Sequence, residues 1–276
     1  MQPANLPVQY VQYTPDRWST IRAEVIVETP VSLTINGADW LTFMCTPVDL
    51  EAMAVGFLFN EGVIDSMDAI ASVRLCAAGD NVDIWLNHAA IKPDKWRRTS
   101  GCTGGVTHLE TDSPIPPVPD GSVLSAESIG SLINCLFESQ QLYQKSGGVH
   151  TTALSDGEDL LVVTEDIGRH NTLDKLAGRC LLEGISSTQK VILTTGRISS
   201  EMLQKAARMG AAILISRTSP SSLSIHLAQR LGVTLIGYAR RNRFNIYANP
   251  HRIISNNIST KDAFPELVGL AQTSPT

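Results

Sequence analysis

The sequence lacks the features that would place it in a membrane or on nucleic acid. Its 276 residues contain no apolar run long enough to cross a bilayer, and residues 1–22 lack the basic-then-apolar pattern of a signal peptide. The net charge of −5 argues against broad nucleic-acid binding, which needs a basic surface. With 43% hydrophobic and 18% charged residues, we expect a globular, cytoplasmic protein without membrane or nucleic-acid partners.

Several signatures of catalysis and binding are also missing. The chain has no G-x-G-x-x-G, no G-x-x-x-x-G-K-[ST] and no G-x-S-x-G, so dinucleotide, P-loop and hydrolase sites are not supported. It has no H-x-E with P-C-x-x-C, which argues against zinc deaminase chemistry. The five cysteines are odd in number, widely spaced and free of any C-x-x-C pair. We therefore expect neither a disulfide framework nor a structural zinc site.

The first part of the chain has the pattern of strands around one helix. Asn36-Gly37 is a two-residue hairpin signal between apolar segments. Thr46 is a candidate helix cap, followed by Pro47 at the first helical position and Asp49 where a capping box needs an acid. These signals predict a helix ending near residue 61, with strands at residues 25–27, 31–35, 40–44, 73–76 and 82–86.

The second part alternates short apolar runs with helical patterns. A helix is predicted over residues 125–145, a hairpin over 151–164 and a helix over 169–182. Apolar strands at 191–193, 211–215 and 233–236 alternate with helices at 201–209 and 221–231. This alternation is typical of parallel strands covered on both faces. We place a lobe boundary in the Pro-rich segment, giving an α+β lobe over 1–121 and an α/β domain over 122–276.

Cys102 is the main candidate for covalent chemistry. It lies among glycines, which let another molecule approach the backbone closely, and shortly after Arg97 and Arg98, which favour the thiolate. A thiolate on such a loop can accept a sulfur atom as a persulfide and deliver it elsewhere. The alternative is a small packing residue in a glycine turn. For the other cysteines, Cys45, Cys76, Cys135 and Cys180, packing is the favoured interpretation.

Two successive strand-to-helix turns are rich in hydroxyls and arginine. Residues 194–200 include Arg197 and Ser199, and residues 216–222 include Arg217 and Thr218. Helix N-termini present free N–H groups and partial positive charge, and ligands bind at the carboxyl ends of parallel strands. The two turns therefore favour an anionic ligand, although hydroxyls at these positions also serve as ordinary helix caps.

Two further segments carry candidate polar residues. One follows the third apolar strand and has three arginines, with aromatic rings that could stack on a nucleobase; it comprises Tyr238, Ala239, Arg240, Arg241, Asn242 and Arg243. Its alternative is a solvated basic loop. The other segment is residues 165–175, where His170 and Asp174 share a helix face, with His150 and Glu165 as additional acid–base candidates. For this second segment the residues alone favour a satisfied polar face at a lobe interface.

The order and spacing of three blocks resemble the FdhD/NarQ family of formate dehydrogenase accessory sulfurtransferases. The blocks are residues 165–175, residues 201–205 and residues 235–238, and the likeness runs from about residue 25 to residue 252. This resemblance implies a three-layer α/β/α domain with a mixed sheet, similar to cytidine deaminases, plus a smaller β-rich N-terminal lobe.

The resemblance also implies a function. Family members take sulfur from a cysteine desulfurase as a persulfide and pass it to the bis(molybdopterin guanine dinucleotide) form of the molybdenum cofactor, before that cofactor enters formate dehydrogenase. They are commonly homodimers and need no structural metal. The cofactor is bound as a substrate, and guanine nucleotides mimic it near the segment corresponding to residues 238–243.

One departure from the family concerns its loop thiols. The C-x-x-C pair of well-known members is represented here by Cys102 alone, with Gly105 three residues later, which argues against an internal disulfide. The resemblance assigns the persulfide to Cys102, with His170 or His150 assisting proton transfer. The predicted cofactor-binding set is residues 238–243 with Arg197, Ser199, Arg217, Thr218 and His170. The alternatives are a noncatalytic cofactor chaperone or insertion factor, and an unrelated nucleotide-dependent enzyme on the same fold.

Overall fold

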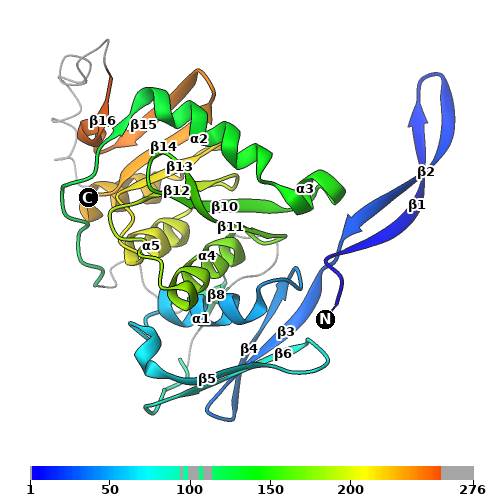
Figure 1. Cartoon of the computed structure of the whole chain (residues 1–276), viewed down its shortest axis with the longest axis horizontal. Coiled ribbons are helices and arrows are strands. Elements are labelled where there is room, and N and C mark those ends of the chain that lie inside the picture. The colour runs from blue at the N-terminus through cyan, green and yellow to red at the C-terminus, as the bar shows by residue number, and fades with distance from the viewer. Residues whose placement is uncertain (1, 94–95, 99–105, 108–113, 256–276) are drawn as a thin grey trace, which may run out of the picture.

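A computed structural model describes residues 2–93, 96–98, 106–107 and 114–255 of the chain. Figure 1 shows a hairpin that projects from the body, a small sheet with one helix, and a larger sheet with helices on both sides. No helix within these described ranges is long and apolar enough to cross a membrane.

The projecting hairpin, here called the arm, consists of β1 (Asn5–Thr14) and β2 (Arg17–Ile26), paired antiparallel. Its base rests on the short helix α3 (Gln141–Ser146), where the Ser146 hydroxyl donates to Asn5 Oδ1 at 3.2 Å. The sequence pattern predicted only residues 25–27 as a strand. The arm was missed because both of its faces mix apolar and polar side chains, which blurs the alternation expected of a half-buried strand.

The small sheet has the strand order β4-β3-β6-β5. Its strands are β3 (Thr29–Ile35), β4 (Ala38–Cys45), β5 (Ile70–Leu75) and β6 (Asn81–Leu86), with a 3₁₀ turn at Met67–Ala69. Alternate residues of β3 are buried against α1 (Leu50–Asn60), as period-2 patterning requires. The predicted Asn36-Gly37 hairpin is confirmed, and both residues have positive φ angles of 50° and 78°.

The predicted start of α1 is wrong by three residues. Thr46 does not cap the helix, because its N–H donates to Asp166 Oδ2 at 3.0 Å and its hydroxyl accepts from the Ile167 N–H at 3.2 Å. Asp49 instead precedes the first helical residue, in the left-handed region and without a side-chain cap. The polar groups of Thr46, which local sequence rules assign to helix capping, are therefore bonded to Asp166 and Ile167 instead.

Two short strands frame the segment that contains Cys102. They are β7 (Arg97–Arg98) and β8 (Val106–Thr107), paired antiparallel. The buried Thr107 hydroxyl donates to Glu61 Oε2 at 2.9 Å, directly after α1, and so fixes the end of β8 to the body. Cys102 itself lies outside the described residues.

The large sheet is mixed and has six strands in the order β11-β10-β12-β13-β14-β15. Its parallel centre is β12 (Val191–Thr194), β13 (Ile213–Ser216) and β14 (Thr234–Arg240), and its antiparallel flanks are β10 (His150–Ser155), β11 (Leu160–Asp166) and β15 (Arg243–Ala248). All residues of β12 and β13 are buried, as expected for strands covered on both faces.

Helices cover both faces of this sheet (Figure 1). The helix α2 (Ala126–Glu138) lies on one face, and α4 (Arg169–Glu183) and α5 (Ser200–Arg208) lie on the other, where α5 contacts α6 (Ser222–Leu231). The remaining elements are β9 (Leu124–Ser125) and β16 (Ile253–Ile254), which pair with each other, and a 3₁₀ turn at Pro250–Arg252. The mixed α/β class predicted from the sequence is confirmed.

Two predictions in this half need correction. The single helix expected over residues 125–145 is two helices, α2 and α3, separated at Ser139 and Gln140. The third apolar strand does not end at residue 236 but continues to Arg240 and turns into β15, which was not predicted. The division into lobes at residue 121 stays a prediction. Buried apolar residues form one cluster between Val31 and Leu86 and a second between Ile115 and Ile253.

A seam of buried charges joins α1 to α4. The two helices approach so closely that a Cβ on Gly56 would lie 1.8 Å from the Asp174 carbonyl oxygen, and one on Gly178 would lie 1.8 Å from the Ala52 carbonyl oxygen. One ion pair, Lys175 with Asp166 at 2.6 Å, lies at the start of this contact, and a second, Lys205 with Asp174 at 2.7 Å, lies beside it. This seam, defined by the two ion pairs and the helix crossing, fixes the small sheet and its helix to the large one.

Candidate functional site

The two polar turns predicted as an anion site lie side by side. Thr194 and Ser216 end the neighbouring parallel strands β12 and β13 in register. The Ser216 hydroxyl donates to the Gly196 carbonyl at 2.6 Å, and the Arg217 N–H donates to the Thr194 carbonyl at 3.2 Å. These hydrogen bonds hold the backbone of both turns together at the carboxyl ends of the strands, where ligands of open α/β sheets bind.

The third predicted segment joins them as the end of a strand rather than as a loop. The Tyr238 N–H donates to the Thr218 carbonyl at 3.0 Å, and the Arg240 guanidinium donates to the Arg217 carbonyl at 2.6 Å. Tyr238 is 46% exposed with a positive φ of 51°, and Ala239 is fully buried. Three segments, each about 20 residues after the last, therefore meet at the carboxyl ends of β12, β13 and β14, here called the strand-end site.

The exposed part of this third segment is the β14–β15 turn and its neighbours. Arg241, Asn242 and Arg243 are all exposed, so their donors face solvent. Ala239 packs into the hydrophobic cluster and offers only its backbone to a ligand. The predicted basic patch thus consists of arginines, with Tyr238 as an exposed aromatic ring beside them.

One serine in each of the two turns acts as a helix cap. Ser199 precedes α5, and its side chain accepts from the Met202 N–H at 3.5 Å, while Ser221 accepts from the Ser224 N–H at 3.2 Å before α6. The Thr218 hydroxyl lies 3.1 Å from Ser216 Oγ within its own turn. The capping interpretation is therefore confirmed for Ser199. Arg197, by contrast, is exposed and leaves its guanidinium to solvent.

Two histidines lie beside these turns. His170 Nε2 is 3.3 Å from Ser199 Oγ and 4.0 Å from the Glu201 carboxylate, and His150 Nδ1 is 3.5 Å from Thr195 Oγ1. Gly196 fits closely against this group, because a Cβ there would lie 2.9 Å from Arg169 Cβ and 3.5 Å from His150 Nδ1. The need for glycine at this point shows how tightly α4, β10 and the first turn pack together.

The local field is positive and disfavours protonation of both imidazoles. Burial, with the guanidinium groups of Arg169 and Arg197, lowers the pKa of His150, and Asp166 opposes this effect. Burial, with Lys205 and Arg169, lowers the pKa of His170 well below its usual value. Both rings are therefore neutral at pH 7 and can each accept or donate one hydrogen bond.

An aromatic ring that sequence reasoning missed supports Arg217. The Arg217 guanidinium lies 4.0 Å from the ring centroid of Phe137, at the end of α2. Burial and the nearby Arg240 lower the pKa of Arg217, which nevertheless remains charged at neutral pH. No local signal in residues 126–138 links Phe137 to a turn some 80 positions later, because the contact exists only in the folded chain.

Most of the polar stretch at residues 165–175 serves the seam. Glu165 accepts from the Leu142 and Tyr143 N–H groups at 2.7 and 3.1 Å, and Asp174 accepts from Asn60 Nδ2 at 2.8 Å. The predicted shared face of His170 and Asp174 is confirmed, since both side chains point towards the α5 region, at Glu201 and Lys205 respectively. The lobe-interface interpretation therefore holds for Asp166, Asp174 and Lys175, which contact Thr46 and Asn60. The Glu165 side chain instead binds the start of α3, and His170 belongs to the strand-end site.

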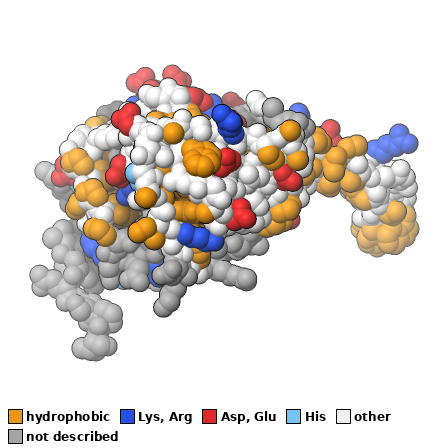
Figure 2. All heavy atoms as spheres, turned by 90° about the horizontal axis from the view of Figure 1, so that it is seen from below, with side chains coloured by type: hydrophobic (Ala, Val, Ile, Leu, Met, Phe, Trp, Pro, Cys, Tyr) orange, Lys and Arg blue, Asp and Glu red, His pale blue; other side chains and the backbone are white. Residues whose placement is uncertain are grey.

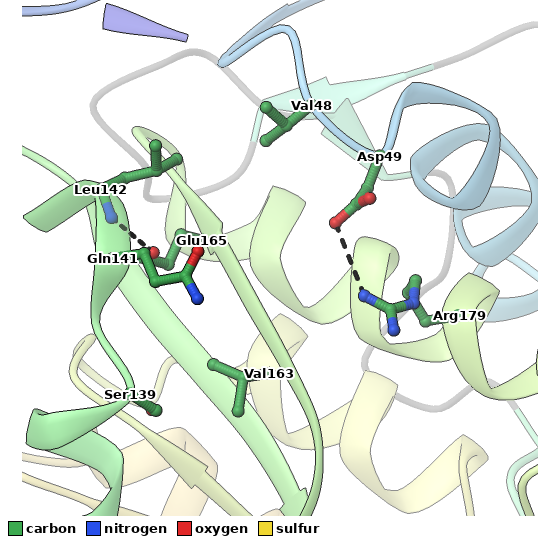
Figure 3. A pocket seen from close by; sticks show the side chains of 8 residues that line it. All are labelled: Val48, Asp49, Ser139, Gln141, Leu142, Val163, Glu165 and Arg179. Atoms are coloured by element: carbon green, nitrogen blue, oxygen red, sulfur yellow. Dashed lines mark hydrogen bonds and ion pairs between the residues drawn. The ribbon is translucent and has the colours of Figure 1, made fainter.

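A separate pocket of about 310 Å³ opens at the edge strand β11 (Figure 3). The Asp49–Arg179 pair, at 3.9 Å, forms one side, and Gln141, Leu142 and Glu165 face it from the other. Apart from Glu165, whose carboxylate is already taken up by two N–H groups, its walls contain none of the predicted site residues. The pocket and the strand-end site are therefore two different places on the molecule.

The described cysteines differ in their surroundings. Burial, together with Asp166, raises the pKa of Cys45 to about 12, and burial raises that of Cys180 to about 11. Cys76 is partly buried and donates to Asp80 at 2.9 Å, as fits a structural thiol. Cys135 is exposed on α2, so the packing interpretation is wrong for this residue, which lies on the solvent side of its helix. Among the described residues, no group of three His, Cys, Asp or Glu side chains is placed to hold a metal ion.

Comparison with known proteins gives a consistent result. The model of a family described as the FdhD/NarQ family matches residues 26–254. The sulfur carrier protein FdhD of Bacillus subtilis (strain 168) is 36% identical over 248 residues, covering 88% of this chain and 95% of its own. The sulfur carrier protein FdhD of Staphylococcus aureus (strain MRSA252) is 33% identical over 252 residues, covering 89% of this chain and 95% of its own.

A solved structure is similar over nearly the same range. It is a protein from Desulfotalea psychrophila, described as a formate dehydrogenase accessory protein, with a TM-score of 0.78 and 33% sequence identity. The alignment covers 91% of this chain and 100% of that one. The fold described above is therefore shared with that protein over its whole length.

Proposed function

The chain belongs to the FdhD/NarQ family, and we propose that it carries sulfur as a persulfide on Cys102 and delivers it to the molybdenum cofactor of formate dehydrogenase. Its relatives are named sulfur carrier proteins, and its structural neighbour is a formate dehydrogenase accessory protein. In this proposal a cysteine desulfurase is the donor, and bis(molybdopterin guanine dinucleotide) is the bound substrate that receives the sulfur.

The observation that carries the proposal is the meeting of three segments at the strand-end site. Arg197, Arg217 and Arg240 come from different strand ends and are brought to one edge of the sheet. A guanine dinucleotide cofactor carries several phosphates, and arginine donates to phosphate in a paired geometry. Exposed Tyr238 offers a ring face on which a base can stack.

The anchored ends of the Cys102 segment lie near this site. Thr107 is bonded to Glu61, and Glu61 Oε1 is 4.0 Å from Lys205 Nζ, whose charge acts on His170. These contacts link β8, at one end of the segment that contains Cys102, to the surroundings of His170 in the strand-end site.

The first chemical step is thiolate attack on a persulfide. The Cys102 thiolate attacks the terminal sulfur of the desulfurase persulfide, a new S–S bond forms, and the donor's S–S bond breaks to release its cysteine thiolate. The product is a persulfide on Cys102. Cys45 and Cys180 are poor candidates for this role, because their raised pKa values leave almost no thiolate at neutral pH.

The test is mass spectrometry of the intact chain after incubation with a cysteine desulfurase and cysteine. We expect a mass gain of one sulfur atom that maps to Cys102, and that disappears in Cys102→Ser. Cys135→Ser is the matched control, because Cys135 is the exposed thiol on α2 and its loss should leave the gain intact. Persistence of the added sulfur in Cys102→Ser would exclude the covalent role.

The alternative of a noncatalytic cofactor chaperone makes a different prediction. Under that alternative, Cys102→Ser still restores formate dehydrogenase activity in cells and still binds guanine nucleotide. The sulfur-carrier proposal requires nucleotide binding to survive while restoration of activity is lost. This pair of readouts separates the two alternatives.

Two finer expectations accompany the proposal. We infer that the large sheet with its helices is the cytidine deaminase-like three-layer unit, which the helices on both faces support (Figure 1). We also infer that sulfur carriage takes place in the cytoplasm, without zinc chemistry, in a homodimer. The deaminase-like fold would then host a sulfur carrier rather than a deaminase, since a fold alone does not set function.

A further inference from the structure

Arg217 in the strand-end site is a cation without a counter-ion in the described part of the chain. Its guanidinium forms no ion pair or hydrogen bond with any described residue, and its Nε is buried without a partner there. Its charged neighbour is a second cation, Arg240, whose Nη1 donates to the Arg217 carbonyl at 2.6 Å and whose charge acts on the Arg217 guanidinium. Two cations held together without a carboxylate favour the binding of an anion.

The Phe137 ring is the surface that the Arg217 guanidinium contacts. The ring centroid lies 4.0 Å from Arg217 Cζ, within the range of cation–π attraction. Phe137 differs from the aromatic residues of the arm, where Figure 2 shows hydrophobic side chains collected and Trp18 is 71% exposed. It is half-buried and packs against the large hydrophobic cluster, so its ring is held in place. An arginine stacked on a ring keeps its in-plane N–H donors for a phosphate.

The helix α2 contacts two basic segments of the site through one of its sides. Phe137 and Gly130 are seven residues apart, about two helical turns, and so lie on the same side of α2. A Cβ on Gly130 would lie 2.2 Å from the Arg241 carbonyl oxygen, so the β14–β15 turn lies directly against the helix. The helix is itself fixed in the core by the buried side chains of Ile129, Leu132, Ile133 and Leu136. One rigid element therefore contacts both Arg217 and the basic turn.

We propose that Phe137 is a positioning residue of the strand-end site, which holds the Arg217 guanidinium where it can bind a phosphate of a nucleotide ligand. An arginine side chain has many rotamers, and ordering them on binding weakens affinity. Repulsion between Arg217 and Arg240 also favours rotamers that keep the two charges apart. The ring offsets both effects before the ligand arrives. The inference rests on the proposed function, because it takes the ligand of this site to be a guanine nucleotide.

The test is calorimetric titration of the full chain with guanosine diphosphate. Phe137→Leu keeps most of the apolar volume but loses the ring, so we expect it to weaken binding about tenfold. Phe137→Tyr keeps the ring and should bind within about twofold of the natural chain. Circular dichroism should show both variants folded, because Phe137 is only half-buried.

A double-mutant cycle separates positioning from a general structural role. Arg217→Gln removes the guanidinium, and we expect it to weaken guanosine diphosphate binding about tenfold or more. Adding Phe137→Leu to Arg217→Gln should cause no further loss of affinity, because the ring acts only through this arginine. A loss of the same size in both backgrounds would show that Phe137 supports the fold of the site rather than the arginine.

The matched control is Phe59→Leu. The Phe59 ring also lies under an arginine, 5.3 Å from Arg208 Cζ, but Arg208 is paired with Asp65 at 2.8 Å and lies outside the strand-end site. This variant should bind guanosine diphosphate as the natural chain does.

Two results would overturn the positioning role, namely natural affinity in Phe137→Leu or an equal loss of affinity in Phe59→Leu. Absence of guanosine diphosphate binding by the natural chain would overturn it together with the ligand of the proposed function. Sulfur carriage is measured separately by the persulfide assay on Cys102, so its failure can be told apart from a failure of this inference.

Discussion

The seam between α1 and α4 and the strand-end site use basic residues in opposite ways. In the seam, Lys175 and Asp166 have side chains that are fully buried, and Lys175 also donates to the carbonyls of Thr46 and Glu165 at 3.0 and 3.2 Å. At the strand ends, Arg197 is exposed, and Arg241 and Arg243 also face solvent. In the seam, the charged groups pair with each other inside the protein. At the strand ends, these guanidinium groups remain exposed and can bind a ligand.

This difference separates structural polar residues from candidate functional ones within residues 165–175. His170 and Lys175 lie five residues apart on α4, yet the first faces Ser199 and Glu201 at the strand-end site and the second is enclosed by the seam. A sequence motif that is dense in polar residues is therefore not necessarily a single functional site. Its members must be sorted by burial and partners before chemistry is assigned to any of them.

The largest effect is expected from breaking the seam with Lys175→Met. The methionine preserves most of the volume but leaves the fully buried Asp166 carboxylate without its cation. Removing one partner of a buried pair typically costs about 3–5 kcal/mol of unfolding free energy. Urea unfolding followed by circular dichroism measures the loss.

Lys145→Met is the control for this change, because Lys145 is exposed on α3 and should alter the unfolding free energy by about 0.5 kcal/mol or less. If Lys175→Met cost no more than this control, the seam would not hold the two sheets together by charge. Guanine nucleotide binding, measured on the folded fraction, should be retained in Lys175→Met.

An intermediate effect is expected at the strand-end site from Arg197→Ala. The side chain is exposed, so unfolding free energy should change by about 0.5 kcal/mol or less. Loss of one phosphate-binding arginine should weaken guanosine diphosphate binding about tenfold, measured by calorimetry. Arg74→Ala, an exposed arginine on β5, is the matched control and should bind normally. Equal affinity in Arg197→Ala would remove this turn from the ligand site.

The sequence predicted the elements whose signals are local. The Asn36-Gly37 turn and the end of α1 before Gly62 follow from positive φ angles that these residues adopt readily. The buried strands β12 and β13 follow from their continuous apolar runs. The start of α1 was missed because Asp166 and Ile167, about 120 residues away, take up the polar groups of Thr46.

The site was predictable only as a set of segments. Topology brings the ends of β12, β13 and β14 to one edge, so the meeting of residues 194–199, 216–218 and 238–240 follows from the strand pattern. The sequence did not reveal that Arg217 rests on Phe137 or that Gly196 abuts Arg169, since both contacts depend on helix packing. Nor did it reveal that Ala239 is buried, because β14 was predicted to end at residue 236.

The smallest effect concerns the pH dependence of stability through His170. Because the folded pKa of His170 is well below its usual value, the unfolded chain binds a proton first as the pH falls below about 6.5. Stability contributed by the neutral ring is therefore present above pH 6.5 and is lost as the pH falls towards the folded pKa. His170→Gln removes this contribution, and should flatten the fall in unfolding free energy by up to about 1.4 kcal/mol per pH unit.

The measurement is urea unfolding at pH 7.5 and pH 5.5 for the natural chain, His170→Gln and His226→Gln. His226 is exposed on α6, so its variant should keep the natural pH dependence. His150 still titrates in His170→Gln and should leave a residual slope, since burial and Arg169 lower its pKa too. An unchanged slope in His170→Gln would mean that the positive field at the strand ends does not reach this ring, and the seam and the strand-end site would then be less distinct than their geometry implies.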